Sequence, residues 1–229
     1  MWTEFRAMTR ESESRIRFLL PSNRHLVEET MTFLKDVGFL FNRRHPRQLY
    51  GVCKVCNTDL FFVRAGDIPW YLAQGAGDLG ITGYDLLYEH GVQAEPLLEL
   101  GYGFCRLCVG VPKDSPCRSV ASLAGARVAT SHPNTTRTFF AQRGIDVEIV
   151  TLKGALEIAP SLGVCEAVVH LVVTGVTNVV NGIRVIADVL PSQAILLGKP
   201  SYPLRKRQGV ERIRAVLSDA VEARSYANA

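Results

Sequence analysis

A short segment combines the end of an apolar run with small, hydroxyl-bearing residues, a pattern typical of a phosphate-binding turn. The run 167–173 is rich in valine, which predicts a buried parallel strand. Thr174, Gly175, Val176 and Thr177 follow it. A glycine lets the backbone approach a ligand, backbone N–H groups can point outward, and threonine hydroxyls can donate hydrogen bonds to phosphate oxygens. The alternative is an ordinary turn between a strand and a helix.

A second segment has the same organisation. Residues 78–83 predict a very short strand that ends at Gly83, and Asp85 begins a short helix. A strand, a glycine and a helix N-terminus in succession form a second candidate site for an anion. Asp85 could instead serve only as the N-cap of that helix.

The cysteines suggest a metal site at first sight. Two Cys-x-x-Cys pairs occur, Cys53 with Cys56 and Cys105 with Cys108, and such pairs can hold zinc. Both pairs lie within or beside strand-like runs, where residues three apart point to opposite faces. Neither pair is followed by a glycine-rich knuckle. The pattern therefore favours buried, reduced cysteines over a zinc site.

Composition bounds the class of protein. The 229 residues include 47% hydrophobic and 21% charged residues, with a formal net charge of +4. These values are ordinary for a globular protein, and scattered basic residues favour small anionic ligands over a nucleic-acid groove. Residues 1–14 are polar, which predicts a disordered leader rather than a signal peptide. With no apolar run long enough to span a membrane, we expect a cytoplasmic protein.

The order of the expected elements predicts an α/β protein of two lobes. Short strands alternate with short helices twice along the chain. We expect lobe I to comprise residues 15–108 and about 186–200, lobe II residues 109–185, and a C-terminal helix residues 201–229. Ligands of such proteins bind in a cleft between the lobes, at the carboxyl ends of the strands.

Five blocks of sequence carry a family resemblance. They are FFVRAGDIPWY (61–71), DLGITGYD (78–85), LGYGFCRL (100–107), VATSHPN (128–134) and GALEIAP (154–160). In order and spacing they resemble the ATP phosphoribosyltransferases of histidine biosynthesis. Each block alone is a weak signal, but five in register identify the chain as a member of that family.

The resemblance implies a fold, a reaction and partners. The fold would be a two-lobed α/β fold like that of type II periplasmic-binding proteins. The reaction would be the displacement of pyrophosphate from phosphoribosyl pyrophosphate by N1 of the adenine of ATP, with Mg²⁺ bound to the phosphates. The chain resembles the short form of the family, which works with a separate regulatory subunit resembling a histidyl-tRNA synthetase. A homo-oligomer, such as a dimer, is also expected.

The resemblance also suggests which residues act. The matching positions imply catalytic roles for Arg24, Arg64 and His170. They imply that phosphoribosyl pyrophosphate contacts Glu157, Thr174, Gly175, Val176 and Thr177. They imply that ATP contacts Arg24, Arg64, Gly83, Asp85 and Cys105. No residue is expected to bind a metal directly. Singly, an arginine is more often a surface cation, and a glutamate near a helix start can simply favour the helix dipole.

Several residues depart from the family pattern at these positions. Ser22 replaces a lysine, His132 replaces a tyrosine, His170 replaces an aspartate, and Val176 replaces an arginine or threonine. A histidine cannot replace a carboxylate as an anion, although it could pair with pyrophosphate or act as a base. Three hypotheses follow: a working but diverged enzyme that could serve a purine-derived pathway, a transferase with another acceptor, or a non-catalytic binding protein. We favour the first.

Overall fold

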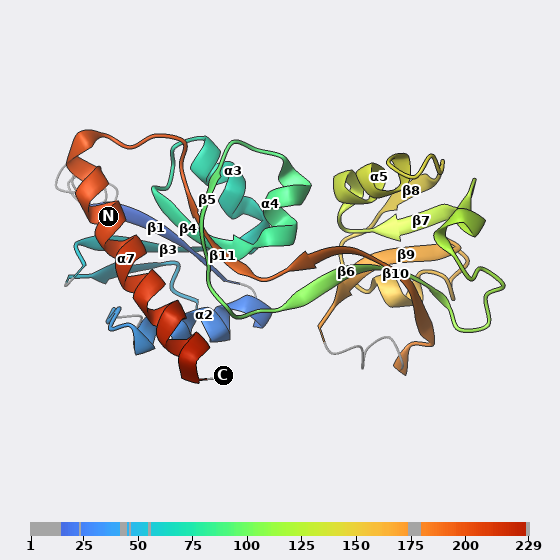
Figure 1. Ribbon diagram of the computed structural model, residues 1–229, viewed down its shortest axis with the longest axis horizontal. Coiled ribbons are helices and arrows are strands. Elements are labelled where there is room, and N and C mark those ends of the chain that lie inside the picture. The colour runs from blue at the N-terminus through green and yellow to red at the C-terminus, as the bar shows by residue number, and fades with distance from the viewer. Residues whose placement is uncertain are drawn as a thin grey trace. The chain divides into compact units, whose positions relative to one another are not determined.

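A computed structural model describes residues 15–22, 24–41, 45, 47–54, 56–173 and 180–227. The predicted leader, residues 1–14, and the predicted phosphate turn, residues 174–177, lie outside this set. The chain forms two compact units (Figure 1). The first unit contains residues up to Leu87, then Gly91–Gly103 and Gln193–Ala229. The second unit contains Tyr88–His90 and Phe104–Ser192.

The first unit is built on a sheet of six strands in the order β2-β3-β1-β4-β11-β5. The strands are β1 (Ile16–Pro21), β2 (Tyr50–Cys53), β3 (Thr58–Val63), β4 (Leu79–Gly83), β5 (Glu95–Glu99) and β11 (Ala194–Gly198). The helices are α2 (Arg24–Asp36), η1 (Ala65–Asp67), α3 (Ile68–Ala73), α4 (Tyr84–His90) and α7 (Leu204–Ala227). The last three residues of α4 belong to the second unit. The three central strands β3, β1 and β4 are parallel, so their carboxyl ends lie at one edge of the sheet.

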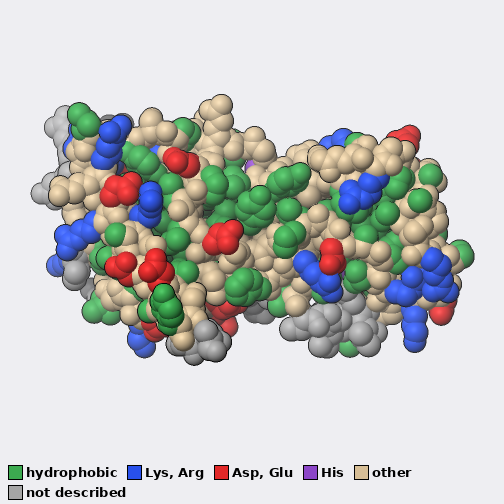
Figure 2. Space-filling model, viewed as in Figure 1, with side chains coloured by type: hydrophobic (Ala, Val, Ile, Leu, Met, Phe, Trp, Pro, Cys, Tyr) green, Lys and Arg blue, Asp and Glu red, His purple; other side chains and the backbone are tan. Residues whose placement is uncertain are grey.

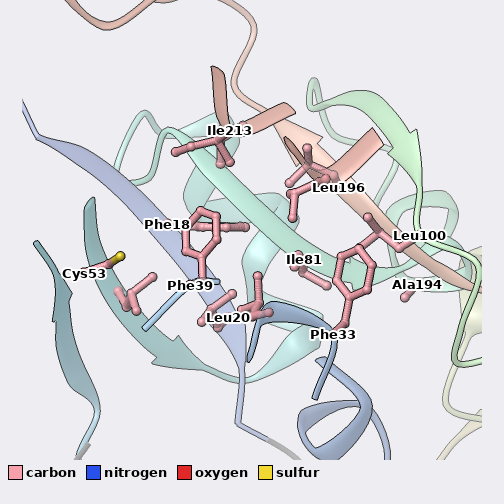
Figure 3. Close-up of a cluster of buried hydrophobic side chains, with 14 of the residues drawn as sticks. Phe18, Leu20, Phe33, Phe39, Cys53, Ile81, Leu100, Ala194, Leu196 and Ile213 are labelled. Carbon is pink, nitrogen blue, oxygen red and sulfur yellow. The ribbon is translucent and has the colours of Figure 1, made fainter. Parts of the chain in front are cut away.

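The main core of the first unit lies on the face of this sheet that α2 and α7 cover. Phe18 and Phe33, both fully buried, lie in this cluster with Ile213 from α7 (Figure 3). Burying one such side chain contributes about 1.5–3 kcal/mol. On the other face, α3 packs closely because Gly80 has no side chain: a Cβ there would lie 2.5 Å from the Cγ2 atom of Ile68. The chain thus buries both faces of the sheet.

The second unit is built on a sheet of five strands in the order β10-β6-β9-β7-β8. The strands are β6 (Cys105–Pro112), β7 (Arg127–Thr130), β8 (Glu148–Thr151), β9 (Ala167–Val172) and β10 (Ile183–Ser192). The helical elements are η2 (Val120–Leu123), α5 (Pro133–Ala141) and η3 (Leu156–Ile158). Strands β8, β7 and β9 are parallel, and β6 and β10 are antiparallel to their neighbours.

The division of the chain differs from the predicted boundaries. Boundaries at 108 and 186 would cut β6 and β10, but these strands pair along their whole length within the second sheet. Such pairing of distant segments leaves no local signal in the sequence. The last helix also begins at Leu204 rather than at residue 201.

Two local predictions were wrong. Glu157, expected near a helix start, lies instead in the 3-10 turn η3 (Leu156–Ile158), since Pro160 cannot donate a helical hydrogen bond. The argument that residues three apart point to opposite faces also fails for Cys53 and Cys56. Strand β2 ends at Cys53, and Cys56, which lies beyond the strand, packs against the same hydrophobic cluster as Cys53. All six cysteines are free thiols.

Charge is distributed without a dominant sign on the face of the molecule shown in Figure 2, where basic and acidic side chains occur on both units. This distribution agrees with the scattered basic residues of the sequence. Among the described helices, none has the length and apolar character needed to cross a membrane.

Candidate functional site

The first unit gathers several predicted residues at the carboxyl edge of its parallel strands. In the register, Pro21 at the end of β1 lies beside Val63 at the end of β3. Arg64 follows β3, is exposed, and has the extended backbone of an N-cap residue before η1. Gly83 ends β4 and is the N-cap residue of α4. Carboxyl ends of adjacent parallel strands are the usual ligand edge of α/β sheets.

A buried hydroxyl that the sequence analysis did not single out connects these turns. The Thr82 Oγ1 atom donates a hydrogen bond of 2.7 Å to the carbonyl oxygen of Ala65. It thereby fixes the segment after β3 to the end of β4, so that Arg64 and Gly83 keep a constant spacing. Asp85 lies in the first turn of α4 and is buried, and the N-cap position predicted for it belongs to Gly83.

Arg24 is the first residue of α2 and follows shortly after Pro21, where β1 ends. Its backbone therefore starts a helix at the same edge of the sheet as Arg64. Its side chain lies outside the described part of the structure. Ser22, the residue that replaces the family lysine, is exposed, and its N–H donates to the Val63 carbonyl oxygen at 2.8 Å.

The second unit has its own carboxyl edge, formed by β8, β7 and β9. Thr130 at the end of β7 lies beside Thr151 on β8 and Val169 on β9. His170 therefore lies on β9 one residue beyond Val169, the residue that pairs with the end of β7. Cys105 begins β6, which runs antiparallel to β9, so this residue lies at the same edge. The predicted residues Cys105, Glu157 and His170 therefore belong to one end of the sheet and the turn beside it.

His170 and Glu157 form a direct pair. The His170 Nδ1 atom lies 3.3 Å from the Glu157 Oε1 atom. His170 is 2% exposed, whereas the Glu157 side chain is 21% exposed. Burial lowers the pKa of His170 from its ordinary value, and the Glu157 charge opposes this shift without reversing it. The imidazole is therefore buried, and the carboxylate is the member of the pair that solvent reaches.

The turn that carries Glu157 has an uncommon backbone. Ala155 adopts φ 45° and ψ 42°, in the left-handed region, where a residue with a side chain is held at a cost of about 1–2 kcal/mol. Such conformations concentrate at functional sites. Glu157 therefore stands two residues after a strained position.

Glu89 is another residue that the sequence analysis missed. Its carboxylate accepts hydrogen bonds from the N–H groups of Asn134 (3.0 Å) and Thr135 (2.8 Å) and from the Thr135 hydroxyl (2.8 Å). A carboxylate at a helix N-terminus satisfies free N–H groups and complements the helix dipole. Glu89 thus caps α5 within the second unit. Nothing in its local sequence distinguishes it from a surface carboxylate.

The chain resembles known proteins over most of its length. A family model described as ATP phosphoribosyltransferase matches residues 64–219. An ATP phosphoribosyltransferase of Methanocella arvoryzae is 37% identical over 210 residues, which are 91% of this chain and 73% of that protein. One of Gemmatimonas aurantiaca is 38% identical over 217 residues, 91% of this chain and 74% of that protein.

Solved structures agree with these sequences. The ATP phosphoribosyl transferase (HisG:HisZ) complex from Thermotoga maritima contains a chain with a TM-score of 0.78 and 27% identity, and the match covers 91% of this chain and 99% of that one. The substrate binding protein of an amino acid ABC transporter matches with a TM-score of 0.60 and 13% identity over 93% of this chain and 94% of that one. That second likeness shows the fold alone, the two-lobed fold of periplasmic-binding proteins. The chain belongs to the ATP phosphoribosyltransferase family, whose members transfer the phosphoribosyl group of phosphoribosyl pyrophosphate to N1 of the adenine of ATP.

Proposed function

We propose that this chain carries out the family reaction with the residues that the two sheets present at their carboxyl edges. The observation that carries the proposal is this placement, which holds for Arg64, Gly83 and Asp85 in the first unit and for Cys105, Glu157 and His170 in the second. The same family match makes a transferase with another acceptor, or a binding protein without activity, the less favoured explanation.

Each unit supplies different chemistry. In the first, Arg64 and Arg24 provide fixed positive charge for phosphate groups, and Gly83 allows a ligand to approach the N-terminus of α4. Asp85 is the other residue of the first unit expected to contact ATP, and Cys105 is the residue of the second unit expected to do so. In the second, Glu157 and the turn 174–177 bind phosphoribosyl pyrophosphate, the turn through backbone N–H groups and threonine hydroxyls. That turn lies outside the described residues and remains a prediction from the sequence.

The reaction is a displacement at the anomeric carbon. The N1 lone pair of adenine forms the new bond to carbon as the bond to the pyrophosphate oxygen breaks, and the electron pair leaves with pyrophosphate. Positive charge develops on the ribose and negative charge on the leaving group. Arginine side chains fixed near the leaving group would stabilise that negative charge, and holding both substrates in line supplies much of the rest of the rate enhancement.

Mg²⁺ is part of the proposal as a companion of the substrates. Among the described residues, no group of three or more His, Cys, Asp or Glu side chains could hold a metal ion. Mg²⁺ commonly binds through substrate phosphates and water rather than a protein cage. It would enter with the phosphates and neutralise part of their charge.

Assembly belongs to the proposal too. The Thermotoga maritima chain with the same fold was solved in a HisG:HisZ complex. We therefore expect this chain to work with a regulatory subunit of that type, resembling a histidyl-tRNA synthetase, and to form a homo-oligomer. Size-exclusion chromatography with light scattering, with and without such a subunit, measures both expectations.

Pyrophosphate release tests the function directly. The protein is incubated with phosphoribosyl pyrophosphate and Mg²⁺, with and without ATP, and the near-ultraviolet absorbance of an N1-substituted adenine is followed. We expect release that depends on ATP, and a fall of roughly 100-fold or more in kcat/KM for Arg64→Ala because a transition-state charge contact is lost. Arg214→Ala is the matched control, since Arg214 is a partly exposed arginine on α7 that pairs with Glu211. Release without ATP, or equal effects of the two variants, would contradict the proposal.

A further inference from the structure

We propose that His170 is a positioning residue: its uncharged imidazole donates the Nδ1 hydrogen to Glu157 and holds that carboxylate in place for phosphoribosyl pyrophosphate. The inference rests on the proposed function for the identity of the ligand. It differs from the sequence-based expectation in the role of His170, which acts through Glu157 instead of touching the reacting atoms.

Burial decides which member of the pair can meet a ligand. The side chain of His170 is 3% exposed and that of Glu157 is 21% exposed. His170 lies on β9, inside the sheet, and Glu157 lies on η3, which packs against β9. A substrate can therefore reach the carboxylate, while the imidazole stands behind it.

The hydrogen bond fixes the tautomer. An ionised carboxylate only accepts hydrogen bonds, so the proton between the two groups belongs to Nδ1. The His170 Nε2 atom is buried and has no hydrogen-bond partner among the described residues. A charged imidazolium would carry a second N–H group at Nε2, and burying it unpaired is costly. The geometry thus favours the neutral ring with its hydrogen on Nδ1, in agreement with the lowered pKa of His170.

Among the described residues, Glu157 is the one that contacts the His170 ring through a hydrogen bond or ion pair. The other titratable and charged groups near the ring have partners of their own. Cys108 on β6 is the cross-strand neighbour of His170, and burial with the nearby Asp188 charge raises the pKa of its thiol to about 12. The Asp188 carboxylate on β10 accepts hydrogen bonds from Cys108 and from Arg106 (3.2 Å and 2.9 Å). His132 follows β7, the other neighbour of β9, and its Nδ1 contacts the Ser131 hydroxyl at 3.0 Å.

Glu157 depends on this single contact. Among the described residues, its side chain has one hydrogen-bonding or ionic partner, His170. Its backbone follows the left-handed Ala155, in a turn of only three residues. A carboxylate on such a short turn samples several rotamers unless another group holds it, and the imidazole supplies that restraint. With a neutral His170, the pair carries one negative charge. The aspartate that the family pattern has in place of His170 would give the pair two.

Nuclear magnetic resonance reads the tautomer without any assay of activity. Long-range proton–nitrogen spectra of nitrogen-15-labelled protein report the five histidines, and His170→Asn identifies the signals of His170. At about pH 6.5, where a free imidazole is half protonated, we expect most of the His170 ring to be neutral with its hydrogen on Nδ1, and we expect its Nδ1 signal to shift in Glu157→Gln. A hydrogen on Nε2, or titration at the ordinary value of about 6.5, would overturn the inference.

Kinetics test the positioning role. We expect His170→Ala to raise the KM for phosphoribosyl pyrophosphate on the order of 10- to 100-fold, since a displacement of about 1 Å can cost 100-fold. His170→Asn keeps an N–H donor and should recover part of the loss. The His170→Ala substitution should add little in a Glu157→Ala background, because removing the Glu157 side chain already removes the hydrogen bond that His170 makes. An equal loss in both backgrounds would refute the role.

The control is Val168→Ala, a buried change on the same strand and the same face of the sheet as His170. It removes packing without removing the hydrogen bond. We expect the KM for phosphoribosyl pyrophosphate to stay within about 3-fold of that of the unchanged protein, while the loss of unfolding free energy is comparable to that of His170→Ala. An unchanged protein that releases no pyrophosphate would refute the proposed function, whereas the spectra would still decide the state of the His170–Glu157 pair.

Discussion

Two partly or fully buried carboxylates, one in each unit, are satisfied to very different degrees. Asp78, before β4, accepts hydrogen bonds from the Lys199 ammonium (2.6 Å), the Lys206 ammonium (2.6 Å) and the Arg17 N–H (2.9 Å). Among the described residues, Glu157 has one side-chain partner, the neutral His170. The first carboxylate is fully used by the fold, and the second keeps capacity for a ligand.

The Asp78 cluster has a structural purpose that its partners reveal. Lys206 lies in the first turns of α7 and Lys199 follows β11. The Tyr202 hydroxyl also donates to the Asp78 carbonyl oxygen at 3.2 Å. Burial alone would raise the pKa of Asp78, but the Arg17 N–H and the two ammonium groups outweigh it and hold the pKa below its ordinary value. The cluster therefore attaches the C-terminal segment to the first sheet.

The largest effect should follow from Asp78→Ala. The substitution leaves two ammonium groups buried without their counter-charge, and breaking a buried pair from one side costs about 3–5 kcal/mol of unfolding free energy. Urea unfolding followed by circular dichroism measures the loss. The control is Lys199→Met, which leaves Lys206 and the Arg17 N–H in place and should cost about 1–2 kcal/mol. Equal losses from the two variants would show that Asp78 is not the centre of the cluster.

A smaller effect on stability is expected for Glu157→Gln. The amide oxygen of glutamine can still accept a hydrogen bond from His170, and the carboxylate that it replaces is partly exposed, so the unfolding free energy should change by less than about 1 kcal/mol. The KM for phosphoribosyl pyrophosphate should nevertheless rise. Unfolding in urea and initial-rate kinetics on the same preparation separate the two effects. A loss of stability as large as that of Asp78→Ala would remove the distinction between the two carboxylates.

The fold was largely predictable because the signals that specify it are local. The apolar run that ends at Pro21 forms β1, and the glycine after residues 78–82 marks the end of β4. Leu26 and Phe33, whose spacing is typical of one face of a helix, lie in α2. The site was predictable only through the family blocks, which place Arg64 and Glu157 at known positions of a shared pattern.

What could not be predicted depends on contacts between distant residues. No local pattern shows that Glu89 caps a helix that begins at Pro133, or that β10 pairs with β6 and moves the boundary of the second unit. Likewise, the sequence shows that residue 170 is a histidine but does not show that its ring is buried behind Glu157. These facts arise from packing, to which each residue contributes only when the whole unit is folded.

The smallest effect is a dependence of stability on pH that separates the two carboxylate sites. Burial lowers the pKa of His170 in the folded protein, so between that pKa and the unfolded value of about 6.5 the unfolded chain binds more protons. The contribution of His170 is therefore fully present above about pH 6.5 and is lost as the pH falls through the folded pKa. Asp78, whose folded pKa is also lowered, keeps its contribution until the pH falls below about 3.9.

Urea unfolding at a series of pH values between about 8 and about 5 measures this loss, with His170→Asn as the reference because its other four histidines are those of the unchanged protein. The unchanged protein should lose stability relative to the variant as the pH falls through this range. A constant difference would mean that His170 binds protons equally in the folded and unfolded states, and the buried neutral ring would then be the wrong description of this site.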